Sequence, residues 1–203
     1  MSSARGNDKT DNEILTGGDP VDQRPHLFDV VLVEPDIPQN TGNIGRTCVA
    51  VHSRLHLIGN LGFEITDKNL KRAGLDYWQH LTWKHIGSVP EWEKQLRNPK
   101  RVFYFSAKAE KSIFDFQYQI GDTFVFGRET KGLPEELMRR NEERCVLIPL
   151  VGPVRGLNLA TSVAVVLYEA FRQTVQRGEL DSSYLAVQWG KVLNSNSYDQ
   201  FNT

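Results

Sequence analysis

A loop at residues 148–158, which contains glycine and proline, has the composition of a site that holds a small ligand through its backbone. Gly152, Pro153 and Gly156 favour a tight turn, because glycine adopts backbone angles that other residues resist and proline fixes its own φ. Asn158 stands where it can cap a helix, and apolar residues recur at helical spacing after it. Since the first N–H groups of a helix have no partner within it, this loop can direct several donors at one ligand.

Two other segments share this order of apolar run, polar loop and helical pattern. They join residues 29–33 to the sequence NTGNIGR at 40–46, and residues 124–126 to the sequence FGRETKGLP at 126–134. The second loop begins like a P-loop, but Leu133 and Pro134 stand where that motif requires Lys and Ser or Thr. No G-x-G-x-x-G motif follows the first strand-like run either. The sequence therefore disfavours a nucleoside triphosphatase and a standard dinucleotide-binding enzyme.

The 203 residues are enough for one α/β domain with a core, and the shares of hydrophobic residues, 39%, and charged residues, 24%, are ordinary for a soluble protein. No apolar run approaches the roughly 20 residues of a membrane helix, and no signal peptide is evident. Cys48, Cys145 and the five histidines have no metal-binding spacing. We therefore expect a cytoplasmic protein without a metal or a membrane anchor. The net charge of −1 gives no general basic field, so RNA binding would rely on local clusters or on a dimer.

Strand-like and helical patterns alternate from residue 28 onward. The strand-like runs are Phe28–Val33, Leu55–Ile58, Leu81–His85, Val102–Ser106, Thr123–Phe126 and Val146–Pro149. The helical patterns are Gly42–His52, Asp67–Leu75, Val89–Leu96, Pro134–Asn141 and Asn158–Gln176, with a further short one at Ser183–Leu193. This alternation predicts an α/β fold with a mostly parallel sheet covered by helices on both faces. We expect a flexible polar tail at residues 1–25, the domain at 26–178 and a polar extension at 179–203.

Three segments of the chain resemble, in order, the three motifs of the SPOUT RNA methyltransferases, and the resemblance covers about residues 28 to 175. The segments are NTGNIGR, FGRETKGLP and IPLVGPVRGLNLATSVAVVLYEA. The sequence DKNLKRAGLDYW at 67–78 resembles the subgroup that methylates the 2′-oxygen of the tRNA wobble ribose, at position 34. The resemblance implies a C-terminal trefoil knot, an exception to the rule that protein chains are unknotted. It also implies S-adenosyl-L-methionine as cofactor, tRNA as substrate and a homodimer through helix 158–176.

The resemblance further implies which residues bind the cofactor. By position they are Phe105, Gly127, Ile148, Gly156, Leu157 and Asn158. Apolar Phe105 and Ile148 suit an adenine face, and Gly127 is expected to let the backbone come close to the cofactor. By residue type alone, Phe105 and Ile148 are more readily explained as packed strand ends. Gly156 departs from the family, which usually has a serine there, so a hydroxyl that could contact the cofactor or the ribose is missing.

The candidate catalytic residues on the same resemblance are Asn40, Arg46, Glu129 and Asn158. An arginine matching Arg46 is the proposed base of the superfamily, but a guanidinium with a pKa above about 12 does not readily give up a proton. We therefore expect Arg46 to clamp a phosphate and orient the ribose, while water or an RNA phosphate takes the proton. The plainer alternatives are a surface arginine at 46, a helix-start acid at 129 and a simple helix cap at 158.

Several basic residues are expected to contact RNA. They are Arg46, Lys71, Arg72, Arg128, Lys131 and Arg155, with Lys68 on the same short helix as Lys71. Tyr77 and Trp78 follow that helix and are expected to stack on bases. The plainer alternative for this short helix is a solvated face.

The last long helix predicts a dimer by its own composition. Its apolar residues exceed what one face of a sheet would cover, and they are Val163, Val166, Leu167, Ala170 and Phe171, with Tyr168 beside them. Two copies together would also create a basic surface that one chain lacks, which answers the difficulty raised by the net charge.

Three functions remain open at this stage. The favoured one is 2′-O-methylation of the tRNA wobble ribose. The second keeps the chemistry and changes the substrate to ribosomal RNA, although many such enzymes carry a separate RNA-binding domain, for which residues 1–25 are too short. The third is a catalytically silent RNA-binding or ligand-sensing module, which the missing serine at Gly156 favours.

Overall fold

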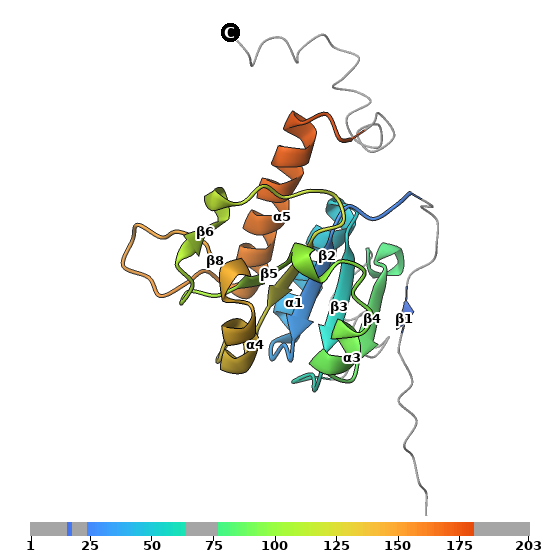
Figure 1. The fold of residues 1–203 in the computed structure, drawn as a ribbon. Coiled ribbons are helices and arrows are strands. Elements are labelled where there is room, and N and C mark those ends of the chain that lie inside the picture. Colours follow the sequence, from blue (N-terminus) through green and yellow to red (C-terminus); the bar gives the residue numbers. More distant parts are fainter. Residues whose placement is uncertain (1–15, 18–23, 64–76, 181–203) are drawn as a thin grey trace, which may run out of the picture.

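The computed structural model describes residues 16–17, 24–63 and 77–180, which form a single sheet with helices around it (Figure 1). The strands are β1 (Thr16–Gly17), β2 (Asp29–Val33), β3 (Arg54–Ile58), β4 (Trp83–Ile86), β5 (Val102–Phe105), β6 (Lys111–Ser112), β7 (Thr123–Phe126) and β8 (Cys145–Leu147). They lie in the order β1-β4-β3-β2-β7-β5-β8-β6. β1 pairs antiparallel with β4 and the other neighbouring pairs are parallel, which confirms the predicted mostly parallel sheet.

Helices cover both faces of the sheet, as the sequence predicts. They are α1 (Pro38–Ala50), α3 (Val89–Glu93), α4 (Glu135–Arg140) and α5 (Leu159–Gln176), with 3₁₀ turns η1 (Trp78–His80), η2 (Pro99–Arg101), η3 (Ile113–Asp115) and η4 (Glu142–Arg144). α1 and α5 share a core with Val30 and Leu32, whereas α3 and α4 share one with Val31 and Val33. Because side chains alternate along a strand, consecutive residues of β2 belong to two cores.

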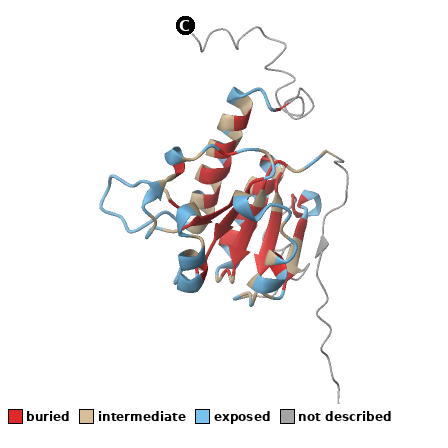
Figure 2. Cartoon of the chain, in the orientation of Figure 1, coloured by how far each residue is buried: buried red, intermediate tan, exposed pale blue. Residues whose placement is uncertain are grey.

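The central strands are buried on both faces (Figure 2). All four residues of β5 and all four of β7 are buried. Strands with two covered faces have no polar side to show, which is why they stand in the sequence as unbroken apolar runs. The rings of Phe103 and Phe124 both meet Tyr118 edge-on, at centroid distances of 5.1 and 5.4 Å. This aromatic packing holds β5 and β7 rigidly beside each other.

The structure corrects the sequence prediction at the first helix. α1 begins at Pro38, not at Gly42, because proline suits the first turn of a helix, where its missing N–H has no partner. Asn40 therefore lies in the first turn of α1 instead of in the preceding loop. The short strands β1 and β6 have no counterpart in the prediction, since two residues are too few to show a period.

Some predictions fall outside the described residues. The predicted helices at Asp67–Leu75 and Ser183–Leu193 lie there, together with Lys68, Lys71 and Arg72. The predicted tail at 1–25, the extension at 179–203 and the trefoil knot stay predictions.

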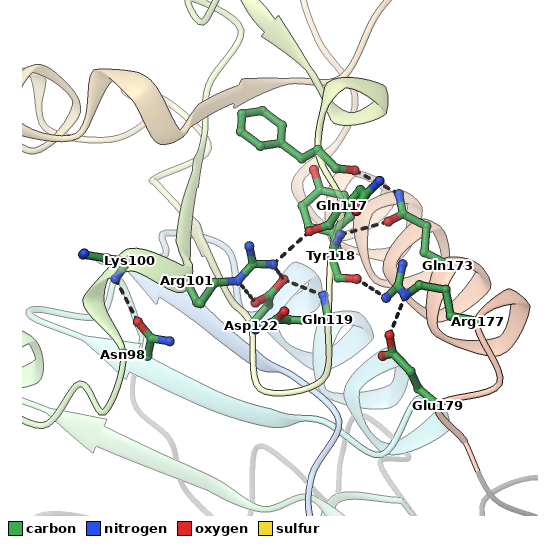
Figure 3. A network of polar contacts seen from close by, with 11 residues as sticks. Asn98, Lys100, Arg101, Gln117, Tyr118, Gln119, Asp122, Gln173, Arg177 and Glu179 are labelled. Atoms are coloured by element: carbon green, nitrogen blue, oxygen red, sulfur yellow. Dashed lines mark hydrogen bonds and ion pairs between the residues drawn. The ribbon is translucent and has the colours of Figure 1, made fainter.

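A polar network holds the C-terminal half of α5 against the loop that leads into β7 (Figure 3). Gln173 accepts a hydrogen bond from the backbone N–H of Tyr118 at 2.9 Å and donates to the carbonyl of Phe116 at 3.2 Å. Arg177 donates to the carbonyl of Tyr118. Because these contacts anchor one end of the helix, its other end, at Leu159, has a fixed position relative to the sheet.

The same loop is anchored to the sheet by a buried ion pair, also visible in Figure 3. Arg101 donates to the carboxylate of Asp122 at 2.7 and 2.6 Å, and Asp122 has no exposed surface. Burial raises the pKa of Asp122, while the hydrogen bonds from Arg101 oppose that rise.

Asp29 forms a second cluster of charged groups, at the start of β2. Its carboxylate accepts hydrogen bonds from Arg54 at 2.7 and 2.8 Å and from His56 at 2.9 Å. Burial raises the pKa of Asp29, but the hydrogen bonds from His56 and Arg54 outweigh burial and lower the pKa to about 2. The ordinary value is 3.8. The ionised group therefore contributes stability that is present above about pH 4 and is lost as the pH falls through about 2.

We expect Asp29→Asn to lower the free energy of unfolding by about 2 kcal/mol at neutral pH. The difference from the wild type should shrink as the pH falls from about 4 to about 2, which urea unfolding at several pH values measures. Glu136→Gln breaks an exposed ion pair with Arg139 and serves as the control, with little expected change. A deficit in Asp29→Asn that stayed constant over this pH range would contradict the assignment.

Candidate functional site

A cavity of about 400 Å³ opens at the carboxyl ends of β5, β7 and β8, a usual place for ligands in an open α/β sheet. The structure brings all six residues predicted to bind the cofactor to its walls, namely Phe105, Gly127, Ile148, Gly156, Leu157 and Asn158. Asn40 and Glu129 also line the cavity. These residues come from four separate stretches of chain, so the fold assembles one site from distant motifs.

One wall of the cavity is apolar and aromatic. The rings of Phe105 and Phe126 are stacked, with centroids 4.7 Å apart and planes 13° from parallel. Phe105 is 7% exposed, so most of its surface is packed in the core and the remainder faces the cavity. Ile148 packs against the same core. Such a wall suits the flat face of a heteroaromatic ring, and the volume is within the usual range for small-molecule sites.

Gly127 lacks a side chain for a reason that the sequence did not reveal. A Cβ at this position would lie 2.1 Å from the carbonyl carbon of Gly132 and 2.2 Å from the nitrogen of Leu133. The turn between them is closed by two backbone hydrogen bonds that join Arg128 and Gly132, at 3.2 and 2.8 Å. Gly127 thus permits a close approach within the chain's own backbone, in addition to the predicted approach to the cofactor, which stays a prediction.

One chain of hydrogen bonds joins the three motif loops. Asn158 Nδ2 donates to Asn40 Oδ1 at 2.9 Å, and Asn40 Nδ2 donates to Glu129 Oε1 at 2.9 Å. The other oxygen of Glu129 accepts the backbone N–H of Asp36 at 2.9 Å. Asn158 Oδ1 caps α5 by accepting the N–H of Ala160 at 2.8 Å. Because a carboxylate can only accept, this chain fixes the orientation of both amides.

The hydrogen-bond chain settles two of the plainer alternatives. Asn158 is indeed a helix cap, and its Nδ2 group also donates a hydrogen bond to Asn40 in α1. Glu129 is not a helix-start acid, since it lies in the turn that precedes α4 and accepts bonds from the 36–40 segment.

Arg128, which was predicted to contact RNA, is engaged in ion pairs within the protein. Its guanidinium donates to Asp36 at 2.6 and 3.1 Å and to Glu34 at 3.2 Å. The hydrogen bonds from Arg128 hold the pKa of Asp36 below its usual value, and the same contact raises the pKa of Arg128. Arg128 therefore ties the 127–132 turn to the end of β2, and an RNA phosphate would have to compete with two carboxylates.

The other described basic residues of that prediction are exposed. Lys131 lines the cavity, and Arg155 lies in the loop that borders it at Gly156. Arg46 is exposed on α1 and is not among the cavity residues. The structure therefore separates Arg46 from the other candidate catalytic residues, Asn40, Glu129 and Asn158.

Tyr77 and Trp78 have exposed fractions of 8% and 9%, so the prediction that they stack on RNA bases is wrong. Two glycines of α1 explain their burial. The Tyr77 hydroxyl donates to the carbonyl of Gly42 at 2.6 Å, and a Cβ on Gly45 would come within 3.0 Å of the Trp78 ring. The guanidinium carbon of Arg46 lies 4.3 Å from the centroid of the Tyr77 ring.

The helix predicted to form a dimer covers its own sheet. Four of its apolar side chains have no exposed surface, namely Val163, Val166, Leu167 and Ala170. They pack with α1 and the strands in one core, so the inference that a sheet face could not cover them is wrong. Of the set named above, Tyr168, 52% exposed, and the partly buried Phe171 remain available to a partner.

Sequence reasoning did not identify several residues of the cavity. Ser106 and Lys108 follow Phe105 in the loop after β5, and Ser162 lies one turn into α5. Helical spacing could have identified Ser162, because residues four apart on a helix share a face and Ser162 follows Asn158 by four.

None of the helices in the described residues is long and apolar enough to cross a membrane. The same residues contain no group of three or more His, Cys, Asp or Glu placed to hold a metal ion. Cys48 and Cys145 are buried free thiols, and burial raises the pKa of both.

Known proteins resemble the chain in sequence and in fold. It is 45% identical over 150 residues to a tRNA (cytidine(34)-2′-O)-methyltransferase of Methylovorus glucosotrophus, covering 72% of this chain and 96% of that protein. A solved structure described as giving insights into the 2-OH methylation of C/U34 on tRNA is similar at a TM-score of 0.69 and 45% identity, over 75% and 99% of the two chains. The SpoU methyltransferase AviRb from Streptomyces viridochromogenes, solved in complex with AdoMet, shares the fold at a TM-score of 0.64 and 24% identity, over 75% and 59%.

A family model agrees with these likenesses. The model described as the SpoU rRNA Methylase family matches residues 28–168, a range that includes the three motif loops and the hydrogen-bond chain between them. The chain belongs to the SpoU rRNA methylase family.

Proposed function

We propose that this protein transfers a methyl group from S-adenosylmethionine to the 2′-oxygen of the nucleotide at position 34 of tRNA. The observation that carries the proposal is the cavity, which is lined both by apolar residues and by the hydrogen-bonded residues Asn158, Asn40 and Glu129. The name of the Methylovorus relative and the description of the C/U34 structure support tRNA as the substrate.

The residues of the cavity fit the cofactor. Its adenine would rest on the wall formed by Phe105 and Ile148, while its polar edges would meet the backbone at Gly127 and at the 148–158 loop. The structural neighbour AviRb, which has the same fold, is described in complex with AdoMet, which agrees with this choice of cofactor. Bound there, the cofactor supplies an activated methyl group.

The chain's own side chains hold the ribose in place. Arg46 grips a phosphate next to the target nucleotide through the two prongs of its guanidinium. Asn40, oriented by Glu129 and Asn158, keeps a fixed amide at the edge of the cavity. With the cofactor bound, water or an RNA phosphate would accept the proton of the ribose hydroxyl, and the cofactor would be left as S-adenosylhomocysteine. The rate gain comes mainly from holding that oxygen in line with the group to be transferred.

Calorimetry and nucleoside mapping test the proposal against its two alternatives. The wild-type chain should bind S-adenosylmethionine and should leave a 2′-O-methyl group at position 34 of purified tRNA, which mass spectrometry of RNase fragments locates. Methylation of ribosomal RNA with no change in tRNA would favour the second function. Absence of cofactor binding would favour the silent module.

Gly156→Ser should raise the affinity for S-adenosylmethionine. Nothing lies within 4 Å of a Cβ built on Gly156, and this residue lines the cavity, so a serine fits without strain. One added hydrogen bond to a ligand corresponds to a gain of about two- to tenfold, which calorimetry measures. An unchanged affinity would mean that the serine usual in the family has no role in binding here.

We also propose that the protein is a homodimer through α5 and the loop before it. Val151, Val154 and Leu157 in that loop are 108%, 59% and 38% exposed, and Tyr168 adds an exposed ring on the helix. Burial of such side chains against a second copy is favourable. A dimer also has twice as many exposed basic residues, such as Lys131 and Arg155, that RNA can contact.

Tyr168→Glu should give a monomer with weak affinity for tRNA, because the change places a charge in an apolar contact. Sedimentation at micromolar concentration and filter binding measure the two effects. Gln95→Glu makes the same change of charge at an exposed position that follows α3, on the other side of the sheet, and should leave the dimer intact. A wild-type monomer that methylates tRNA would contradict the proposed dimer.

Two further features belong to the same proposal. The enzyme would work in the cytoplasm, where tRNA is found. Residues between β8 and the end of α5 would form the trefoil knot that the SPOUT resemblance implies.

A further inference from the structure

Tyr77 contacts Arg46 and its helix from two directions. Its ring lies under the guanidinium, with 4.3 Å between the ring centroid and Arg46 Cζ. Its hydroxyl donates a hydrogen bond of 2.6 Å to the carbonyl oxygen of Gly42. A cation above an aromatic face is attracted by the ring's negative charge, so the ring favours one placement of the guanidinium.

Helix geometry makes the second contact bear on Arg46 as well. Gly42 precedes Arg46 by four residues in α1, so its carbonyl is the one to which the backbone N–H of Arg46 is directed. The Tyr77 hydroxyl therefore fixes the turn of helix that carries Arg46, while the ring fixes the tip of the same side chain.

The packing around Tyr77 leaves it little freedom. Tyr77 is 8% exposed, and its neighbour Trp78 sits against Gly45, where a Cβ would come within 3.0 Å of the Trp78 ring and of the Leu81 side chain. Gly42 is likewise buried in α1. A rigid, buried ring is thus paired with an exposed, long arginine that has many rotamers.

We propose that Tyr77 is a positioning residue that preorganises Arg46 for the RNA phosphate. This inference rests on the proposed function, in which Arg46 grips the phosphate beside the target ribose. Preorganisation lowers the entropy that the arginine loses on binding, so Tyr77 affects RNA binding and transfer but not the cofactor cavity, which it does not line.

A double-mutant cycle tests whether Tyr77 acts through Arg46. Tyr77→Leu should lower single-turnover methyl transfer to tRNA about three- to tenfold, with the affinity for S-adenosylmethionine unchanged. Tyr77→Phe keeps the ring and loses only the hydrogen bond to Gly42, so it should retain more of the rate than Tyr77→Leu. In an Arg46→Ala background, Tyr77→Leu should have no further effect. A full, additive loss in that background would overturn the proposal.

Tyr118→Leu is the matched control for lost stability. Tyr118 is a fully buried tyrosine of the same core cluster, and its ring packs against Phe103 and Phe124. Its effect should add to that of Arg46→Ala. Coupling of the same size for Tyr118 and Tyr77 would show that the cycle reports only general destabilisation, and this outcome would overturn the proposal.

A measurement without turnover separates this inference from the proposed function. In nuclear magnetic resonance spectra, the side-chain Nε–H and δ protons of Arg46 should show an upfield ring-current shift. The shift should persist in Tyr77→Phe and disappear in Tyr77→Leu. Unshifted Arg46 signals in the wild type would overturn the role of Tyr77 even if tRNA is methylated. Shifted signals in a protein that methylates no tRNA would instead count against the proposed function alone.

Discussion

Arg46→Ala is expected to reduce methyl transfer to tRNA by about 100-fold or more, while the affinity for S-adenosylmethionine stays within about twofold. Arg46 is exposed on α1 and does not line the cavity, so its loss is expected to affect the proposed contact with RNA and not the cofactor. Single-turnover rates with tRNA and calorimetry with the cofactor measure the two quantities separately.

Arg46→Lys sharpens this expectation. Lysine keeps the charge but lacks the planar fork that holds two phosphate oxygens and stacks on an aromatic ring. The lysine variant should therefore stay nearly as slow as the alanine variant. Recovery of most of the rate by lysine would show that a point charge is sufficient and would contradict the two-pronged grip.

Gly127→Val is expected to abolish detectable cofactor binding and to lower the stability of the fold. The new Cβ would lie 2.1 Å from backbone atoms of Gly132, a distance that only a shift of the turn can relieve. That turn carries Glu129, so the hydrogen-bond chain to Asn40 should break as well. Calorimetry with S-adenosylmethionine and thermal unfolding measure the two losses.

Gly156→Ala is the matched control for this variant, because it also adds a side chain to a cavity glycine. A Cβ on Gly156 meets nothing within 4 Å, so binding should be close to that of the wild type. Normal binding by Gly127→Val would show that the turn can move without harm, which would contradict the placement of the site.

Much of the fold could be read from the sequence because its signals are local. The run Thr123–Phe126 is a strand with the predicted bounds, since a strand covered on both faces consists mainly of apolar residues, here Phe124, Val125 and Phe126. The long helix at Leu159–Gln176 was equally clear, because Asn158 caps it and its apolar residues keep helical spacing. Resemblance to a family then supplied the cavity residues, which periodicity does not mark.

The failures share a cause, which is contact between segments far apart in the chain. The apolar residues of α5 indicate how much apolar surface must be buried, but they do not indicate that the chain's own sheet buries it. From the sequence, Arg128 is predicted to contact RNA. In the structure it pairs with Asp36, which lies more than 90 residues away in the chain. Tyr77 and Trp78 look like exposed aromatics beside basic residues, whereas Gly42 and Gly45 make room for them on α1.

Methylation of two matched tRNAs tests the central claim most directly. One carries an ordinary ribose at position 34, and the other carries a 2′-deoxyribose at that position alone. With labelled S-adenosylmethionine, the wild-type chain should transfer about one methyl group per molecule to the first and none to the second. Equal labelling of both tRNAs would place the methyl group elsewhere and would contradict the account.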